Sequence, residues 1–366
     1  MNKQRVEMSI EAASACEAGA TGRSGPETLN LRSGDRVLLL GGYGVHNVGD
    51  EAILAGLLQT LPPDIRLSVV SRDPWETACM HGVNAVSPPA ALRALLSTDV
   101  LIVGGGGIFS GHMGLMSRFI PVLGLLARVR RVRVVFHGLG VYPSTPRWVQ
   151  QTIRWLAPHL TSFTVRDSVS AQTLRSWGIP VQQIPDLSNC MPPAPAKRSA
   201  EIVRSLGLQA DAPAVALCLT AVEPGIEAPL LEAIPELVGA LPQVQFCFVP
   251  MSQHPKVTRH NDLLLAHRIQ TCVPQLPVLE NFHHPSDILA LFHRFDAAVC
   301  MRYHSLLFAH RAGAAIVPIP YAEKCESWVQ EYGVTPAKPD AEALIQRVRQ
   351  ELARKTGSGE ALELAP

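Results

Sequence analysis

Short apolar runs alternate with helical patterns along most of this chain, and this alternation constrains the fold more than any other feature. Val37–Leu40 is a continuous apolar run, and after a glycine loop apolar residues recur at helical spacing from Ile53 to Leu61. The same order recurs after Val100–Val103 and after Val215–Leu219. Continuous apolar strands separated by helices are typical of parallel sheets covered on both faces. The sequence therefore predicts an α/β fold of doubly wound, Rossmann-like sheets.

The length of 366 residues suffices for two such domains, each with its own core. Residues 190–198 are proline-rich and polar, which is the composition of a semi-rigid connector. We predict a tail (1–33), an N-terminal domain (34–190), a linker (191–211), a C-terminal domain (212–355) and a second tail (356–366). No apolar run reaches the roughly 18 residues of a membrane span, and the first segment lacks a signal-peptide core. We therefore expect a cytoplasmic protein.

Composition excludes several classes of partner. The formal net charge is +1, so no bulk attraction to nucleic acid or to an acidic membrane surface is expected. The eight cysteines are scattered without a Cys-x-x-Cys pair, which indicates reduced thiols and argues against a disulfide frame or a zinc site. The chain has no Asp-x-Asp, and His283, His284 and His293 are interpreted as loop and helix-surface residues. We therefore predict no metal and no cofactor.

The first glycine loop, residues 41–50, matches neither common nucleotide-binding motif. A dinucleotide fingerprint would place glycine where Asn47 stands, and a P-loop would place lysine where Asp50 stands. A backbone that passes close to a ligand at Gly44, with Asn47 and Asp50 beside it, suits a polyhydroxyl molecule. The alternative is that Asp50 only caps the following helix.

Polar or glycine-rich segments follow several predicted strands, at the edge where open α/β sheets bind their ligands. Gly104–Gly107 are costly in chain entropy, so their backbone is expected to lie close to a ligand or to a packed helix. Arg166 follows the predicted strand Ser162–Val165. It is therefore expected at the same edge of the sheet.

A second strand-to-helix turn carries the strongest chemical signal. Arg302 and His304 lie between the apolar run Ala297–Cys300 and a helical segment that Gly313 should end. Arginine binds carboxylate or phosphate through a planar fork, and histidine is suited to proton transfer near neutral pH. Lys324 follows the next strand, so all three cations share one crevice if the two strands are neighbours. The alternative is a surface arginine and a satisfied, half-buried histidine.

A basic run, Arg128–Arg133, follows an apolar helical segment. It is interpreted as a solvated helix end and strand entry. The alternative is a patch that docks the protein on an anionic membrane surface.

Six segments, in order between about residues 36 and 333, resemble the motifs of the polysaccharide pyruvyltransferase family. They are Gly42–Leu54, Gly104–Phe109, Gly138–Gly140, Thr164–Ser170, Arg302–Ala309 and Tyr321–Lys324. The resemblance implies a GT-B-like fold and transfer of the enolpyruvyl group of phosphoenolpyruvate onto two hydroxyls of a sugar, with release of phosphate. It also implies a role in the biosynthesis of cell-wall or other extracellular polysaccharide.

Carried over residue by residue, the resemblance makes His304 the catalytic acid/base and places phosphoenolpyruvate on Arg166, Arg302 and Lys324. The acceptor sugar, free or lipid-linked, is expected at the glycine-rich loops (Gly44, Asn47, Asp50, Gly106 and Gly107). A lipid-linked acceptor would bring the protein into peripheral contact with the inner face of the membrane. His46 departs from the family pattern, which leaves the acceptor's identity open.

Two rival functions fit parts of the same pattern. A GT-B glycosyltransferase that uses a nucleotide sugar would explain the architecture and the glycine loops. It would also need a pocket for the base and ribose, which the sequence does not locate. A non-catalytic sugar- or anion-binding protein would need the cations but not His304.

Overall fold

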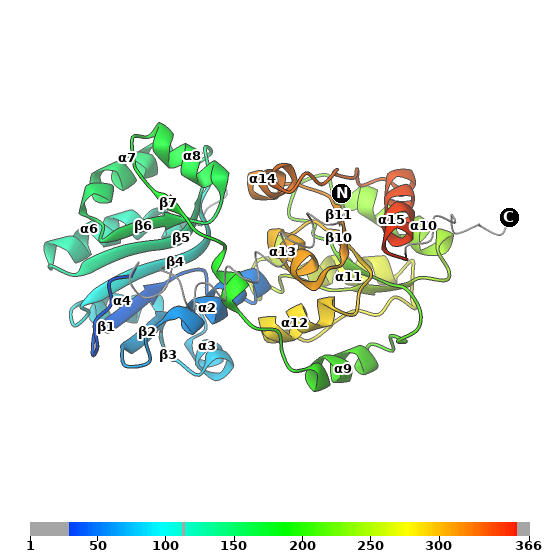
Figure 1. The fold of residues 1–366 in the computed structure, drawn as a ribbon, viewed down its shortest axis with the longest axis horizontal. Helices are drawn as coiled ribbons and strands as arrows, with labels where there is room; N and C mark the ends of the chain where they lie inside the picture. Colours follow the sequence, from blue (N-terminus) through cyan, green and yellow to red (C-terminus); the bar gives the residue numbers. More distant parts are fainter. Residues whose placement is uncertain (1–28, 112–113, 357–366) are drawn as a thin grey trace. The chain divides into compact units, whose positions relative to one another are not determined.

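The computed structural model describes residues 29–111 and 114–356, which form two compact units (Figure 1). Among the described residues, unit 1 holds residues 29–45 together with those of the range Asp50–Pro192, and unit 2 holds His46–Gly49 and residues 193–356. The segment predicted as a linker contains the helix α9 (Ala196–Ser205). Most of the predicted tails, residues 1–28 and 357–366, lies outside the described residues. Leu29 is buried in the core of unit 1.

Unit 1 contains a seven-stranded parallel sheet with the order β3-β2-β1-β4-β5-β6-β7. Its strands are β1 (Arg36–Leu40), β2 (Arg66–Val70), β3 (Asn84–Val86), β4 (Val100–Phe109), β5 (Arg133–Val141), β6 (Ser162–Val165) and β7 (Gln182–Gln183). Its helices are α2 (Val48–Thr60), α3 (Pro74–His81), α4 (Pro88–Leu95), α5 (Leu115–Arg118), α6 (Ile120–Val129), α7 (Arg147–Leu156) and α8 (Ser168–Ser176), with short 3₁₀ turns at Ala157–His159 and Leu187–Cys190.

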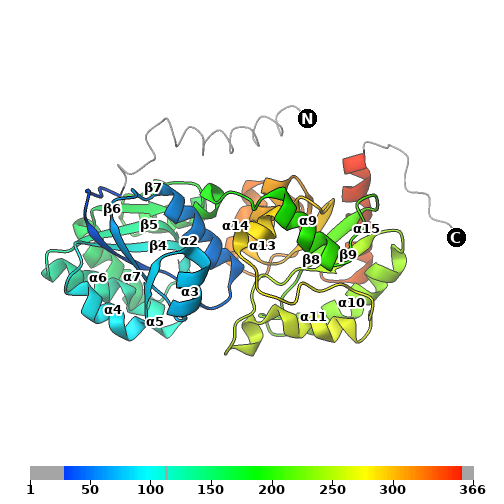
Figure 2. The same ribbon diagram turned by 90° about the horizontal axis from the view of Figure 1, so that it is seen from below.

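Alternation along the strands builds two cores in unit 1. In β1, Leu38 and Leu40 pack with α4, α6, α7 and α8, whereas Val37 and Leu39 pack with α2 on the opposite face. Successive side chains of a strand point to opposite faces, so a strand that is apolar throughout must be covered on both sides. Figure 2 shows the layer of α4, α5, α6 and α7 along one side of this sheet.

Unit 2 contains a four-stranded parallel sheet with the order β11-β10-β8-β9. Its strands are β8 (Ala214–Cys218), β9 (Gln245–Phe248), β10 (Ala297–Cys300) and β11 (Ala315–Pro318). Its other helices are α10 (Glu227–Ala240), α11 (Asp262–Gln270), α12 (Pro285–Phe292), α13 (Tyr303–Ala312), α14 (Glu323–Glu331) and α15 (Ala341–Thr356), with a 3₁₀ turn at Thr258–His260.

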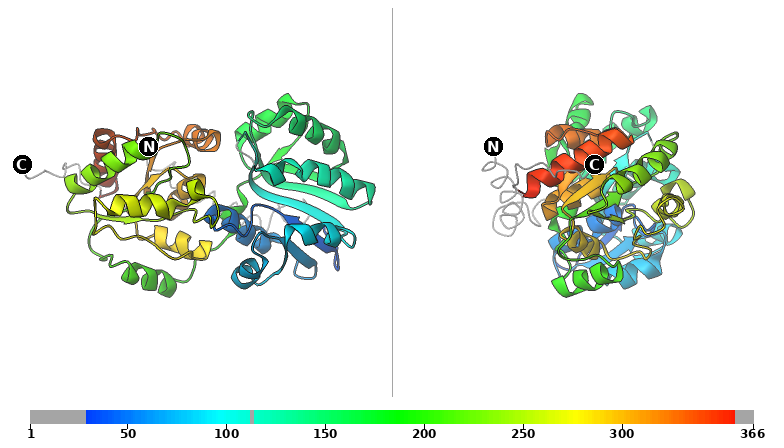
Figure 3. Two further views of the ribbon diagram at one scale, coloured as in Figure 1. Left: turned by 180° about the vertical axis from the view of Figure 1, so that it is seen from behind. Right: turned by 90° about the vertical axis from the view of Figure 1, so that its right-hand side faces the viewer.

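The core of unit 2 forms where α10, α11 and α15 pack on one face of the sheet. Helices α10 and α15 lie side by side (Figures 1 and 3). Helix α13 packs against β10 and β11, and Gly313 ends it with φ 70°, as predicted. The two parallel sheets covered by helices confirm the predicted α/β class.

The helix after the first glycine loop begins earlier than the sequence indicated. It starts at Val48, so Asp50 lies within its first turn and is not the cap. Asn47 precedes the helix, and its Oδ1 accepts a hydrogen bond from the Gly49 N–H at 3.0 Å. The interpretation of Asp50 as the N-cap is therefore wrong.

Candidate active site

The carboxyl edge of the unit 2 sheet gathers most of the predicted cationic residues. Strands β10 and β11 are neighbours, with Cys300 beside Pro318 in the register. Arg302 follows β10, and Lys324 lies in the first turn of α14, after β11. His304 lies in the first turn of α13 and is half-buried. The condition set by the sequence, that the two strands lie side by side, is confirmed.

Arg302 is held by a buried carboxylate that the sequence did not reveal. Its Nε and Nη2 donate hydrogen bonds to Asp262 over 3.1 and 2.6 Å, and Nη2 also donates to the Thr220 hydroxyl at 2.9 Å. The Asp262 carboxylate also accepts from the N–H groups of Met251 and Ser252 at 3.2 and 3.0 Å. Four donors thus fix one carboxylate, and that carboxylate fixes the arginine.

The surroundings keep Arg302 charged. Burial by itself would lower the pKa of the guanidinium, but the adjacent Asp262 carboxylate outweighs it and raises that pKa above the ordinary value. Burial raises the pKa of the Tyr321 hydroxyl to about 12, against the opposing effect of Arg302. Tyr321 is therefore a neutral hydrogen-bonding group beside a permanent cation at physiological pH.

His260 also belongs to this charged cluster, although the sequence analysis did not include it. Its pKa is lowered to about 4, first by burial and then by the positive charges of Arg302, Arg259, His254 and Lys324. Its ring centroid lies 6.3 Å from that of His254. A neutral imidazole that several cations surround marks a region of positive potential. No local sequence pattern indicated a role for His260, because it lies in the long connection between β9 and α11.

Gly49 explains how His304 is positioned within unit 2. A Cβ at this glycine would lie 2.0 Å from His304 Nδ1, so no side chain fits there. The backbone around Gly49 is anchored to the same unit, since the Val48 N–H donates to the Met251 carbonyl at 3.0 Å and Asn47 bridges to Ser252. The glycine loop thus supplies a wall for the imidazole as well as a candidate acceptor contact at Asn47.

His46 adopts the left-handed backbone conformation, with φ 54°, which is uncommon for a residue other than glycine. Its ring stacks on Phe282 with the centroids 4.7 Å apart and the planes 12° apart. The aromatic contact gives a physical reason for the histidine at this position.

Arg166 lies in unit 1, in a buried network at the end of β6. Its side chain is 1% exposed, its Nη1 donates to Asp186 at 3.1 Å, and its Nη2 donates to the Tyr142 hydroxyl at 3.2 Å. That hydroxyl donates in turn to Asp167 at 2.9 Å. Within unit 1, Arg166 therefore holds together the carboxyl ends of neighbouring elements.

Four of the candidate acceptor residues lie at the edge of the unit 1 sheet: Gly44, Asp50, Gly106 and Gly107. The Asp50 carboxylate lies beside Gly42 and Gly106, where a Cβ would come within 2.9 and 3.2 Å of its oxygens. Glu51, which the sequence analysis did not single out, is buried. Its carboxylate accepts from the Gly44 N–H at 2.8 Å and lies 2.8 Å from His81 Nε2.

The four consecutive glycines belong to β4 and do not form a separate loop. A Cβ at Gly105 would lie 1.9 Å from Ile53 of α2, so a packed helix explains this glycine. Gly106 and Gly107 continue the strand, and the register with β5 shifts between Gly106 and Phe109. The alternative of a packed helix therefore accounts for Gly105, and the candidate ligand contacts lie further along the strand.

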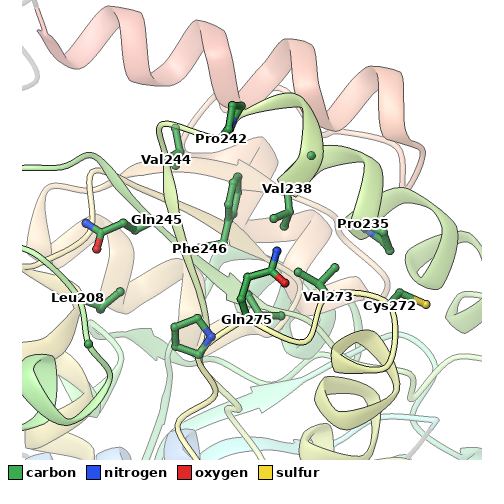
Figure 4. A pocket seen from close by; sticks show the side chains of 14 residues that line it. Leu208, Pro235, Val238, Pro242, Val244, Gln245, Phe246, Cys272, Val273 and Gln275 are labelled. Atoms are coloured by element: carbon green, nitrogen blue, oxygen red, sulfur yellow. The ribbon is translucent and has the colours of Figure 1, made fainter.

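A depression of about 450 Å³ in unit 2 lies away from this edge (Figure 4). Its lining includes Gln245, the first residue of β9, whereas the charged residues follow the last residues of the strands. Its lining contains Leu208, Val238, Phe246 and Val273 and no charged side chain. It therefore does not suit an anionic substrate.

A family model described as polysaccharide pyruvyl transferase matches residues 47–323. The chain belongs to the polysaccharide pyruvyl transferase family. This membership makes the protein a transferase of polysaccharide biosynthesis, as the six sequence segments indicated. A search of curated proteins finds no significant match.

Solved structures similar to this pyruvyl transferase have the GT-B fold. UDP-GlcNAc 2-epimerase from Neisseria meningitidis, bound to UDP-GlcNAc, is 14% identical with a TM-score of 0.58, over 86% of this chain and 90% of the other. The S. aureus MnaA–UDP complex is 9% identical with a TM-score of 0.63, over 89% and 92%. Sucrose-phosphate synthase from Thermosynechococcus elongatus is 12% identical with a TM-score of 0.52, over 88% and 90%. At these identities the likeness establishes the fold, and the predicted GT-B architecture is confirmed.

Across residues 29–111 and 114–356, no helix is both long and apolar enough to cross a membrane. In the same described ranges, no three His, Cys, Asp or Glu side chains are grouped so that they could hold a metal ion.

Proposed function

We propose that this transferase forms a pyruvate ketal on a sugar of a cell-surface or extracellular polysaccharide, with phosphoenolpyruvate as the donor and phosphate as the second product. The observation that carries the proposal is the cluster in unit 2. Arg302 and Lys324 follow neighbouring strands, and both raise the positive potential at His260. His304, in the first turn of α13, supplies a group able to transfer a proton at the same edge.

The donor's charges fit this edge of the sheet. Phosphoenolpyruvate carries a phosphate and a carboxylate, and charged hydrogen bonds to such groups are the strong ones. Helices α13 and α14 both begin here, and the free N–H groups of a helix start favour an anion. Lys324 lies at such a start, where the helix dipole disfavours a cation. A bound anion would offset that cost.

The chemistry follows from the same residues. His304 in its imidazolium form donates a proton to the methylene carbon, and C2 becomes an oxocarbenium-like electrophile. A sugar hydroxyl adds to C2 and loses its proton, phosphate departs, and the second hydroxyl closes the ketal. Neutral His304 accepts one of the two hydroxyl protons, which restores the acid, and the departing phosphate takes the other. A positioned acid/base contributes about 10²–10⁴-fold to the rate of such a step.

The assignments of the donor-binding and acceptor-binding residues have different support. The assignment of Arg302 and Lys324 to phosphoenolpyruvate is supported by the unit 2 cluster. Arg166 rests on the family motif, and its ion pair with Asp186 predicts that its removal also destabilises unit 1. We assign the acceptor to Gly44, Asn47, Asp50, Gly106 and Gly107, and we place the reaction in the cytoplasm.

The test separates the acid from the anion ligands. His304→Gln preserves hydrogen bonding but cannot protonate carbon, so we expect it to lose turnover while phosphoenolpyruvate affinity stays within a few-fold. Arg302→Met and Lys324→Met should mainly weaken binding, by roughly 1.5–3 kcal/mol for each charged hydrogen bond lost. Each variant is titrated with phosphoenolpyruvate beside single-turnover rates with a competent acceptor. Near wild-type turnover by His304→Gln would refute the assignment of the acid.

The same assay discriminates the rivals. A GT-B glycosyltransferase would turn over a nucleotide sugar and ignore phosphoenolpyruvate. A non-catalytic anion-binding protein would bind phosphoenolpyruvate but release no phosphate with any acceptor.

A further inference from the structure

An unusual share of the exposed apolar surface lies on one layer of helices in unit 1. Among the described residues, nine large apolar side chains are exposed, and seven of them belong to α4, α6 or α7, to the residue that follows α4 or to the residue that precedes α6. These seven are Leu92, Leu96, Phe119, Leu126, Val129, Trp148 and Trp155. Isolated exposed apolar residues are ordinary on a protein, whereas a concentration on one face marks an interaction surface.

The exposed apolar side chains of α6 and α7 form one surface, because the two helices are adjacent. The two helices lie side by side (Figures 1 and 2), and the rings of Phe119 and Trp148 are 5.9 Å apart. Along α6, Phe119, Leu126 and Val129 recur at spacings of seven and three residues, and Trp148 and Trp155 are seven residues apart on α7. These spacings place each set on one side of its helix. The buried residues of the same helices, such as Ala127 and Ile153, face the sheet.

The charge around this face has a single sign. Residues 100–166 contain no Asp, Glu or Lys but eight arginines. Arg128, Arg130, Arg131, Arg147 and Arg154 are exposed and belong to α6, α7 or the turn after α6. In the described part of the chain, none of these five lies within ion-pair distance of a carboxylate. Their positive charge is therefore available to an external partner.

We propose that this α6–α7 face, with the neighbouring outer side of α4, docks the protein on an anionic lipid bilayer. Tryptophan and phenylalanine insert at the level of the headgroups, and arginines pair with lipid phosphates around them. A second copy of the chain is a poorer occupant, because the same face would bring like charges together without a compensating carboxylate. Such docking would hold the transferase next to a lipid-borne sugar.

The test measures binding to vesicles, without substrate, so its outcome is independent of the proposed reaction. The full chain is sedimented with vesicles of phosphatidylcholine alone or mixed with phosphatidylglycerol. We expect binding to the anionic vesicles, release by salt, and a blue shift of tryptophan emission. Arg128→Gln/Arg130→Gln should lower the affinity roughly twenty-five-fold, at about fivefold for each arginine near the surface. Trp148→Ser/Trp155→Ser should lower it by roughly tenfold for each side chain.

Matched controls use exposed residues elsewhere. Trp75 is 77% exposed on α3, which contacts α2 through the His81–Glu51 pair and so lies at the other face of the sheet. Trp75→Ser and Arg66→Gln/Arg204→Gln should leave vesicle binding unchanged. Equal losses in the controls, or no binding of the wild-type chain to anionic vesicles, would overturn the proposal. A tryptophan pair variant that changes the sedimentation velocity of the free protein instead would assign the face to a second copy.

Discussion

Replacing Asp262 with alanine should destabilise unit 2 more than any exposed substitution. The carboxylate is 1% exposed and accepts four hydrogen bonds, two of them from the Arg302 guanidinium. Alanine would leave that guanidinium in a buried site without its counter-charge. Breaking a buried pair by removing one partner costs about 3–5 kcal/mol. We expect a loss of that size in the free energy of opening unit 2.

The assay must report on unit 2 by itself, because a chain of two domains need not unfold in one step. Cys218 and Cys300 serve as probes, since they lie on adjacent strands of unit 2 and are 0% and 1% exposed. Thiol labelling, resolved by peptide mass spectrometry, gives the opening free energy at each cysteine.

Two further variants make the result decisive. Asp211→Ala, at an exposed position before β8, is the control and should change the opening free energy little. The double variant Asp262→Ala/Arg302→Met should lose less than the sum of the single losses, because it removes both charges together. A loss below about 1 kcal/mol in Asp262→Ala would refute the view that the pair is a tightly held unit.

Two other predictions follow from the structure. Gly49→Ala would place a Cβ 2.0 Å from His304 Nδ1, so kcat should fall while phosphoenolpyruvate affinity stays within a few-fold. The control is Gly239→Ala, where a Cβ meets nothing within 4 Å. Equal kcat values for the two variants would contradict the prediction. Burial lowers the pKa of His137 from 6.5 to about 4, so the unfolded chain takes up the proton first as the pH falls, and unit 1 should lose about 3 kcal/mol of stability between pH 6.5 and 4. His137→Asn should flatten that part of the curve of unfolding free energy against pH, and an unchanged slope would exclude His137 as its source.

Local sequence patterns predicted the strands, turns and helices around the site. They could not predict contacts between residues that are far apart in the sequence. The strand Ala297–Cys300, the turn at Arg302 and the helix end at Gly313 all follow from neighbouring residues. The pairing of Arg302 with Asp262 joins residues 40 apart, and nothing near either residue announces it. The same reason hid the contact of Gly49 with His304. Glu51 is only seven residues from the Gly44 N–H that it binds, and no familiar loop motif marks that local contact.

Chain length and composition could not reveal that residues 46–49 belong to unit 2. The glycine loop reads as one motif before α2, yet His46–Gly49 groups with unit 2, through the stacking of His46 on Phe282 and the bridge from Asn47 to Ser252. Asn47 was predicted as an acceptor residue of the N-terminal domain. Its contacts in the structure are to unit 2.

The central claim is that phosphoenolpyruvate is the donor of a ketal-forming transfer, and the product tests it most directly. The purified protein is incubated with phosphoenolpyruvate labelled with ¹³C at C2 and with a panel of polysaccharide sugars, and the products are examined by NMR. The account predicts that one sugar acquires the label as a ketal carbon bonded to two of its oxygens, with one phosphate released for each ketal, and that His304→Gln forms none. The account would be contradicted if the label stayed in phosphoenolpyruvate while the protein transferred a sugar from a nucleotide sugar to the same acceptor.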